Sequence, residues 1–171
     1  MKFIPKMQST KQIFDNLVGI WSIKRVLGNY GTAEGTAKFT LQNQAPNKFE
    51  NQTERRTNDV LVINYREDLQ VKYLSDLGPN IENTAYKEYV YLYDKARDKI
   101  VKKFTNGNLF YELSIDFEKQ TANGDHLCEK DMYKALYTFV NPQNFILTYF
   151  VNGPKKDYLI ETAFTKQVTR S

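Results

Sequence analysis

The 171-residue sequence holds a single cysteine, Cys128, so no disulfide can form within one chain. Small secreted domains usually depend on disulfides, and their absence indicates a reducing compartment. Long apolar runs are also missing: the N-terminal segment is too polar for a signal peptide, and no segment approaches the roughly 18 apolar residues of a membrane-spanning helix. We therefore expect a soluble, intracellular, cytoplasmic protein with no membrane span. Three lysines precede the first acidic residue, Asp15, which leaves mitochondrial import as the alternative.

Linker sequences and clusters of one charge are equally scarce. With only 8 glycines and 5 prolines, the chain has no low-complexity segment, and its length fits a single domain over residues 1–171. The 24 basic and 20 acidic residues are interspersed, which leaves a net charge of +4 and no basic run longer than a pair. Nucleic-acid-binding proteins usually gather positive charge on one face. We expect a mildly basic, solvated surface and no nucleic-acid partner.

Aromatic residues are plentiful, with 12 tyrosines and 11 phenylalanines, and this bias favours strands over helices. One short helix is still predicted, over residues 9–18, because a capping-box pattern begins at Ser9 and an apolar stripe follows it. The stripe consists of Ile13, Phe14, Leu17 and Val18. A helix of this length is not stable alone, so we expect the stripe to pack on the rest of the domain.

The sequence after the helix reads as short strands separated by turn residues. The strands are expected over residues 21–26, 35–42, 48–56, 59–66, 69–74, 86–93, 99–104, 109–117, 126–140, 145–151 and 156–166. A meander of about ten strands with no helix between them hides its edges best by closing on itself. We predict an all-β fold, an antiparallel up-and-down β-barrel over residues 21–166, wide enough to hold a small ligand. A β-sandwich is the alternative.

The segment from His126 to Tyr133 contains the densest group of chemically active side chains. Positions two apart on a strand share a face, so His126 points with Cys128, and Asp131 points with Tyr133. The odd spacing between Cys128 and Asp131 puts the two pairs on opposite faces of a continuous strand. A β-bulge between them would bring all four inward, and we expect one there.

The chemistry of this segment is left open by its composition. A structural zinc site needs about four ligands, mostly His and Cys, and the chain has one of each. A haem needs one axial ligand, which His126 could supply; the alternative is a histidine hydrogen-bonded inside the barrel, to Asp131 or a tyrosine. A nucleophilic pair of Cys128 and His126 is not favoured, because two residues on one strand face lie too far apart to hydrogen-bond.

Two further features add candidates for a site. Tyr89, Tyr91 and Tyr93 alternate along one strand and therefore share a face. A hairpin at residues 153–158 precedes the last strand, and its Lys156 and Asp157 could form a charged pair at the mouth of a barrel. The alternative for this hairpin is a solvated turn.

With these motifs the sequence resembles an uncharacterised family of lipocalin-like (calycin) domains with no assigned function. The resemblance covers nearly the whole chain and begins with Leu17-Val18-Gly19-Ile20-Trp21 and Arg25. It is most specific in two motifs, His126-x-Cys128-x-x-Asp131-x-Tyr133 and Gly153-Pro154-x-Lys156-Asp157-Tyr158 followed by Thr162. It implies a calycin barrel and supplies no substrate.

The resemblance also implies structural roles, and the chain departs from the family in places. Trp21 is expected across the closed end of the barrel, covered by the cation of Lys166 or Arg170. Family members often carry Arg and His where this chain has Asn108 and Tyr111, and Arg where it has Lys166. An Arg–His pair of the family is therefore missing here.

The leading hypothesis is a barrel that binds a small apolar or aromatic ligand in its interior; no catalytic residue, metal or cofactor is assigned. The first alternative is a non-catalytic subunit of a larger intracellular assembly, with a barrel filled by its own side chains. The second is a haem- or cofactor-assisted enzyme. The candidate ligand-binding residues are Tyr89, Tyr91, Phe110, His126, Cys128, Asp131, Tyr133, Lys156, Asp157, Tyr158 and Thr162, and the structural candidates are Trp21, Arg25 and Lys166.

Overall fold

The computed structural model describes residues 3–43, 59–74 and 81–168, and these ranges contain one helix and eleven strands. The elements are α1 (Thr10–Leu17), β1 (Gly19–Leu27), β2 (Gly31–Leu41), β3 (Val60–Tyr73), β4 (Ile81–Asp94), β5 (Lys99–Lys103), β6 (Leu109–Glu112), β7 (Ser114–Asp116), β8 (Thr121–Cys128), β9 (Asp131–Asn141), β10 (Asn144–Gly153) and β11 (Lys156–Lys166).

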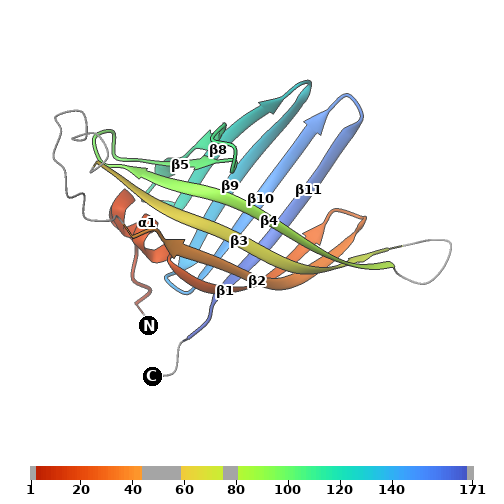
Figure 1. Ribbon diagram of the computed structural model, residues 1–171, viewed down its shortest axis with the longest axis horizontal. Helices are drawn as coiled ribbons and strands as arrows, with labels where there is room; N and C mark the ends of the chain where they lie inside the picture. The colour runs from red at the N-terminus through yellow and green to blue at the C-terminus, as the bar shows by residue number, and fades with distance from the viewer. Residues whose placement is uncertain (1–2, 44–58, 75–80, 169–171) are drawn as a thin grey trace.

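All eleven strands belong to one antiparallel sheet, in the order β6-β5-β4-β3-β2-β1-β11-β10-β9-β8-β7. Neighbours in the sheet are neighbours in sequence except where the first strand, β1, pairs with the last, β11. β6 lies against β8, so the sheet curls round into a nearly closed barrel with α1 at one end (Figure 1). The predicted antiparallel, up-and-down barrel is confirmed.

Most strand boundaries shift by a few residues, and the division of the chain into strands differs from the predictions in three places. The expected strands 59–66 and 69–74 are one continuous strand, β3, because residues 67 and 68 stay in register with β4. The expected strand 109–117 is divided into β6 and β7. The expected strand 126–140 is two strands, β8 and β9. The expected strand 48–56 lies outside the described residues.

The helix forms where its capping pattern predicts. The Ser9 hydroxyl accepts a hydrogen bond from the Gln12 backbone amide at 3.0 Å, and Val18 follows the last turn. The buried face of α1 carries Ile13, Phe14 and Leu17. The Leu17 carbonyl also accepts a 2.8 Å hydrogen bond from the Trp21 indole, so the helix end is fixed to the first strand.

Truncating Leu17 to Ala should lower the free energy of unfolding by about 2–5 kcal/mol, because the side chain is buried and its removal leaves a cavity under α1. Urea denaturation followed by tryptophan fluorescence measures this loss. Lys11→Ala, on the exposed side of the same helix, is the matched control and should change stability by less than about 0.5 kcal/mol. An equally small loss for Leu17→Ala would show that α1 is a loose appendage.

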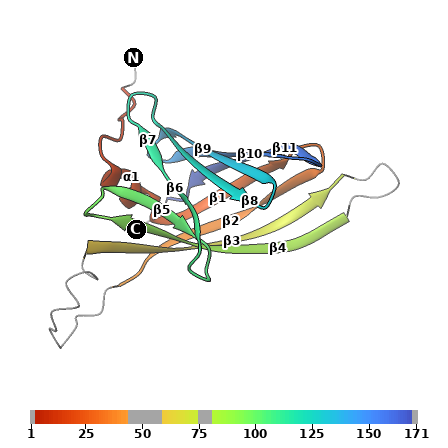
Figure 2. The same ribbon diagram turned by 90° about the horizontal axis from the view of Figure 1, so that it is seen from above.

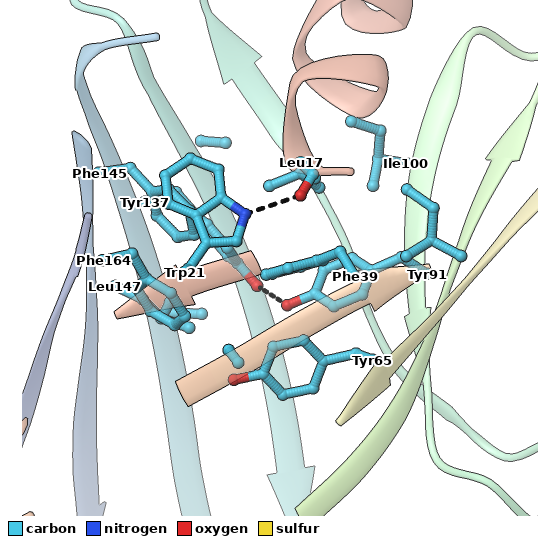
Figure 3. Packing of buried hydrophobic residues seen from close by; sticks show 14 of the residues in the cluster. Leu17, Trp21, Phe39, Tyr65, Tyr91, Ile100, Tyr137, Phe145, Leu147 and Phe164 are labelled. Carbon is cyan, nitrogen blue, oxygen red and sulfur yellow. Dashed lines mark hydrogen bonds between the residues drawn. The ribbon is translucent and has the colours of Figure 1, made fainter. Parts of the chain in front are cut away.

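Side chains fill the end of the barrel that α1 covers. Trp21 has its indole 4.9 Å from the Phe145 ring centroid, and Phe145 stacks on Phe164 at 4.3 Å (Figure 3). The Lys166 ammonium lies 5.1 Å from the indole centroid, as predicted, and donates to the Asn16 carbonyl at 2.7 Å. Arg170, the other predicted cation, lies outside the described residues. The Trp21, Phe145 and Phe164 side chains are all buried, and we call this half of the barrel the filled half.

The opposite end of the barrel is open. β4 pairs with β5 only over residues 90–94, and β8 pairs with β7 only over residues 121–123. Within the described ranges, the remaining parts of β4 and β8 therefore have no partner strand on those sides. The β3–β4 hairpin diverges from the hairpins of β8 to β11 as the strands run away from α1 (Figures 1 and 2). We call the half of the barrel away from α1 the open half.

Candidate functional site

The β8–β9 hairpin places the whole first motif on the inner face of the open half. His126 pairs with Tyr133 and Cys128 pairs with Asp131, so all four side chains point to one side. The predicted bulge is absent: a two-residue turn at 129–130, with Glu129 at a φ of 55°, reverses the chain between Cys128 and Asp131. The prediction of one continuous strand with a bulge was therefore wrong. The turn itself brings all four side chains to the same face, which is what the bulge was expected to do.

The four residues of this motif lie at different depths. The His126 ring is half-buried, 5.1 Å from the Phe110 ring centroid and 5.7 Å from that of Phe104, with Tyr133 at 6.5 Å. Cys128 is exposed at the hairpin tip. Within the described part of the chain, the side chains of His126 and Tyr133 make no hydrogen bond to the protein.

The second motif is split between the rim and the interior. Lys156 pairs with Asp131 at 3.2 Å, not with the predicted Asp157, which is exposed. This ion pair joins the β8–β9 hairpin to the β10–β11 hairpin at the rim. Tyr158 is half-buried on the inner face, whereas Thr162 is buried further down the same strand.

The most unusual residue of the interior, Lys102, was not among the sequence candidates. It lies on β5 opposite Tyr91 and is only 2% exposed. Its ammonium group donates a 3.0 Å hydrogen bond to the Tyr149 hydroxyl. Aromatic rings surround the Nζ atom, and the distances to their centroids are 4.1 Å for Tyr89, 5.1 Å for Tyr91, 5.4 Å for Phe110, 5.6 Å for Tyr111, 5.7 Å for Tyr149 and 5.8 Å for Tyr65.

A chain of tyrosine hydroxyls leads from Lys102 into the filled half of the barrel. Tyr149 bonds to Tyr111 at 2.7 Å, Tyr111 to Tyr137 at 2.6 Å, and Tyr137 to Tyr91 at 2.9 Å (the last bond is drawn in Figure 3). Burial raises the pKa of all four phenols well above the ordinary value, so they stay protonated and act as hydrogen-bond donors and acceptors. Gly124 faces the Tyr111 ring where a Cβ atom would collide with it.

A buried ion pair lies beside this chain. Both carboxylate oxygens of Glu67 accept 2.8 Å hydrogen bonds from the Arg25 guanidinium, and one also accepts a 2.5 Å bond from Tyr65. Arg25 further donates to the Thr162 hydroxyl at 2.8 Å. Burial alone would raise the pKa of Glu67, but the hydrogen bonds and charge of Arg25 outweigh it and hold this pKa below its ordinary value.

The charge of Lys102 is therefore not compensated by a partner of its own. Within the part of the chain that the structure describes, no carboxylate forms an ion pair with this amine, and Tyr149 is its only hydrogen-bond acceptor. Burial lowers the pKa of Lys102 to about 7; the charge of Glu67 opposes this shift and that of Arg25 adds to it. Burial in this interior therefore favours the neutral form of the Lys102 amine.

The described residues contain no group of three or more His, Cys, Asp or Glu side chains placed to hold a metal ion. Their one helix is too short to cross a membrane.

The fold and this interior define a lipocalin-like β-barrel protein. The chain belongs to a family of unknown function, DUF6314, whose profile matches residues 17–166. No curated protein matches the sequence. Among solved structures, the barrel is similar to the S-type phycobiliprotein lyase CPES from Guillardia theta, with a TM-score of 0.61, 11% sequence identity and 95% of each chain covered. At this identity the likeness establishes the fold alone.

Proposed function

We propose that the protein binds a small, flat, largely apolar or aromatic ligand in the open half of the barrel. The observation that carries this proposal is the contrast between the two halves. Inner-face residues are buried near α1, whereas a group of aromatic residues on the inner face of the open half remains partly exposed to solvent, beside buried neighbours such as Val151. The partly exposed inner side chains are Tyr89, Phe104, His126, Tyr133, Tyr149 and Tyr158. A barrel that served only as a filled scaffold would bury such rings.

The chemistry of these side chains suits an aromatic ligand. Phe104 and Phe110 stack on each other at 4.6 Å, and the half-buried Phe104 offers its ring to a bound molecule. His126 and Tyr133 are free to form hydrogen bonds with it. Ligand pockets commonly combine apolar walls with a few such polar groups. A barrel of this fold in a protein named as a phycobiliprotein lyase supports the proposal further.

Two measurements on the purified protein test the proposal. Native mass spectrometry should detect a small molecule that co-purifies with the chain. The dye anilinonaphthalene sulfonate should bind saturably to protein stripped of that molecule, in a 1:1 complex. An absorbance spectrum of the same sample tests the haem alternative through its Soret band. A stripped protein that shows neither a retained molecule nor saturable dye binding would favour the filled scaffold.

Tyr133→Phe should weaken dye binding about five-fold and leave the unfolding midpoint unchanged. The lost hydroxyl makes no hydrogen bond within the described protein, and one bond to the dye sulfonate contributes about 1 kcal/mol. Fluorescence titration measures the dissociation constant. Tyr86→Phe, an exposed tyrosine on the outer face of β4, is the matched control and should leave binding unchanged. Equal affinities for the two variants would remove Tyr133 from the site.

A further inference from the structure

We propose that Lys102 is a covalent attachment point for a ligand that carries an aldehyde. The Nζ atom attacks the carbonyl carbon, a C–N bond forms, and the carbonyl oxygen leaves as water, which gives an imine. The net reaction is R-NH₂ + R′CHO → R-N=CHR′ + H₂O, and it requires no oxidant or reductant. This inference rests on the proposed function, since the aldehyde must first occupy the open half of the barrel.

The surroundings of Lys102 separate it from an ordinary structural lysine. A buried lysine is usually retained with a carboxylate partner, because an unpaired ammonium is costly to desolvate. Here the one buried carboxylate nearby, Glu67, directs both oxygens at Arg25. Lys102 is left with a single phenol as acceptor and with rings on its other sides. These conditions favour the neutral amine, which is the form that attacks a carbonyl.

The amine lies within reach of the proposed ligand. Its closest ring, that of Tyr89 at 4.1 Å, is itself only half-buried. Phe110 lies 5.4 Å from the amine and 5.1 Å from the His126 ring. The rings of Tyr89 and Phe110 are in contact, with their centroids 5.7 Å apart. A rotation of the half-buried Tyr89 ring would therefore let an aromatic aldehyde place its ring against Phe110 and its carbonyl toward Nζ.

The proton transfers have a candidate donor in Tyr149. Its hydroxyl is 3.0 Å from Nζ and 2.7 Å from the Tyr111 hydroxyl. Dehydration of the first adduct, a carbinolamine, requires a proton on the departing oxygen, and the amine nitrogen releases one. A phenol beside the nitrogen can donate its proton to the departing oxygen and take up the proton that the nitrogen releases, so that it is neutral again at the end of the step. The hydroxyl chain behind it stabilises the phenol during this exchange. Tyr149 is thus a positioning and proton-relay residue for the step.

The test uses the full chain with cinnamaldehyde and sodium cyanoborohydride at pH 7, which converts an imine into a stable secondary amine. Peptide mapping by mass spectrometry then compares the labelling rates of all lysines. We expect Lys102 to react at least about 10-fold faster than any other lysine, because ordinary lysines, with a pKa near 10.4, are almost wholly protonated at this pH. The Lys102 rate should rise with pH up to about 7–8 and then level off.

Variants and a non-reactive analogue make the outcome decisive. Lys102→Met should abolish the fast adduct, whereas Lys103→Met, its neighbour on β5, should retain it. Tyr149→Phe should slow labelling several-fold more than it weakens binding of cinnamyl alcohol, which lacks the carbonyl. Saturable binding of cinnamyl alcohol with no preferential labelling of Lys102 would overturn the inference and leave the proposed function standing. Absence of both alcohol and dye binding would overturn the two together. The wild-type map alone decides the site if a variant fails to fold.

Discussion

Replacement of Lys102 by methionine should stabilise the protein at neutral pH, and the gain should shrink as the pH rises. Methionine is unbranched and only one heavy atom shorter than lysine, and it removes a buried amine that has no ion-pair partner among the described residues. Tyr149 keeps its hydrogen bond to Tyr111, so the substitution leaves this hydroxyl with a partner. Replacement of buried charges by apolar residues of similar volume is often neutral or stabilising.

The pH dependence follows from the lowered pKa of Lys102, about 7 in the folded protein against about 10.4 in the unfolded chain. Between these values the unfolded chain binds a proton that the folded protein does not bind. Each unit of falling pH therefore favours the unfolded wild type by about 1.4 kcal/mol, until both states are protonated below pH 7. The full effect is about 4–5 kcal/mol, and it vanishes above the unfolded pKa. Methionine does not titrate, so the variant escapes this loss.

Urea denaturation at pH 6.5, 8.0 and 9.5 measures the difference between variant and wild type. We expect this difference to be largest at pH 6.5 and to fall by about 1.4 kcal/mol per pH unit above pH 7. Lys103→Met is the control: the difference in its free energy of unfolding from that of wild type should not show this dependence on pH. A Lys102→Met difference that stays constant across the series would show that the buried amine is fully charged in the folded protein.

The architecture was predictable because it depends on patterns that repeat along the chain. Alternation of apolar and polar residues and frequent turn signals specify short antiparallel strands, and the absence of helices between them leaves closure as the way to hide edges. The inner positions of the β8–β9 hairpin followed from the same alternation. For this hairpin only one prediction was wrong: a β-bulge was expected where the structure has a turn. The turn was missed because Glu129-Lys130 lacks the usual glycine or asparagine.

The buried charges were not predictable from these patterns. Lys102 and Lys103 form a basic pair, which in isolation is typical of a solvated surface. What places Lys102 inside is its register opposite Tyr91, on a strand whose other face carries Lys103. Similarly, Glu67 and Asp68 fall between two predicted strands, 59–66 and 69–74. In the folded protein Arg66 and Asp68 point outward and pair with each other, whereas Glu67 points inward.

The pairing of Glu67 with Arg25 arises only in the closed sheet. The two residues are 42 positions apart, and β2 lies between their strands. The Arg25 side chain reaches across the inner face of β2, which is lined there by small residues such as Ala33 and Gly35. A one-residue slip in either register would direct one of the charges to the outer face. The ion pair between Arg25 and Glu67 can therefore form only when β1, β2 and β3 have the observed register.

Glu67→Gln should lower the free energy of unfolding by about 3–5 kcal/mol near pH 7. The substitution preserves the shape of the side chain but leaves the Arg25 guanidinium, whose side chain is only 14% exposed, without a compensating charge. The double variant Arg25→Met/Glu67→Leu removes both charges and should recover most of this loss, since apolar residues of similar volume replace a buried pair at little net cost. Urea denaturation of the single and double variants measures the coupling.

Acid titration provides an independent check of the same pair. Because the folded-state pKa of Glu67 lies below its unfolded value of about 4.3, the stabilisation by the carboxylate is complete above that value and is lost as the pH falls through the folded pKa. Wild-type stability should therefore decline more steeply than that of Glu67→Gln below about pH 4, and the two curves should approach each other. Parallel curves, or a loss under about 1 kcal/mol at pH 7, would show that the interior tolerates an unpaired Arg25. In that case the same solvent access that relieves Arg25 would extend to Lys102, and its amine would be protonated at neutral pH.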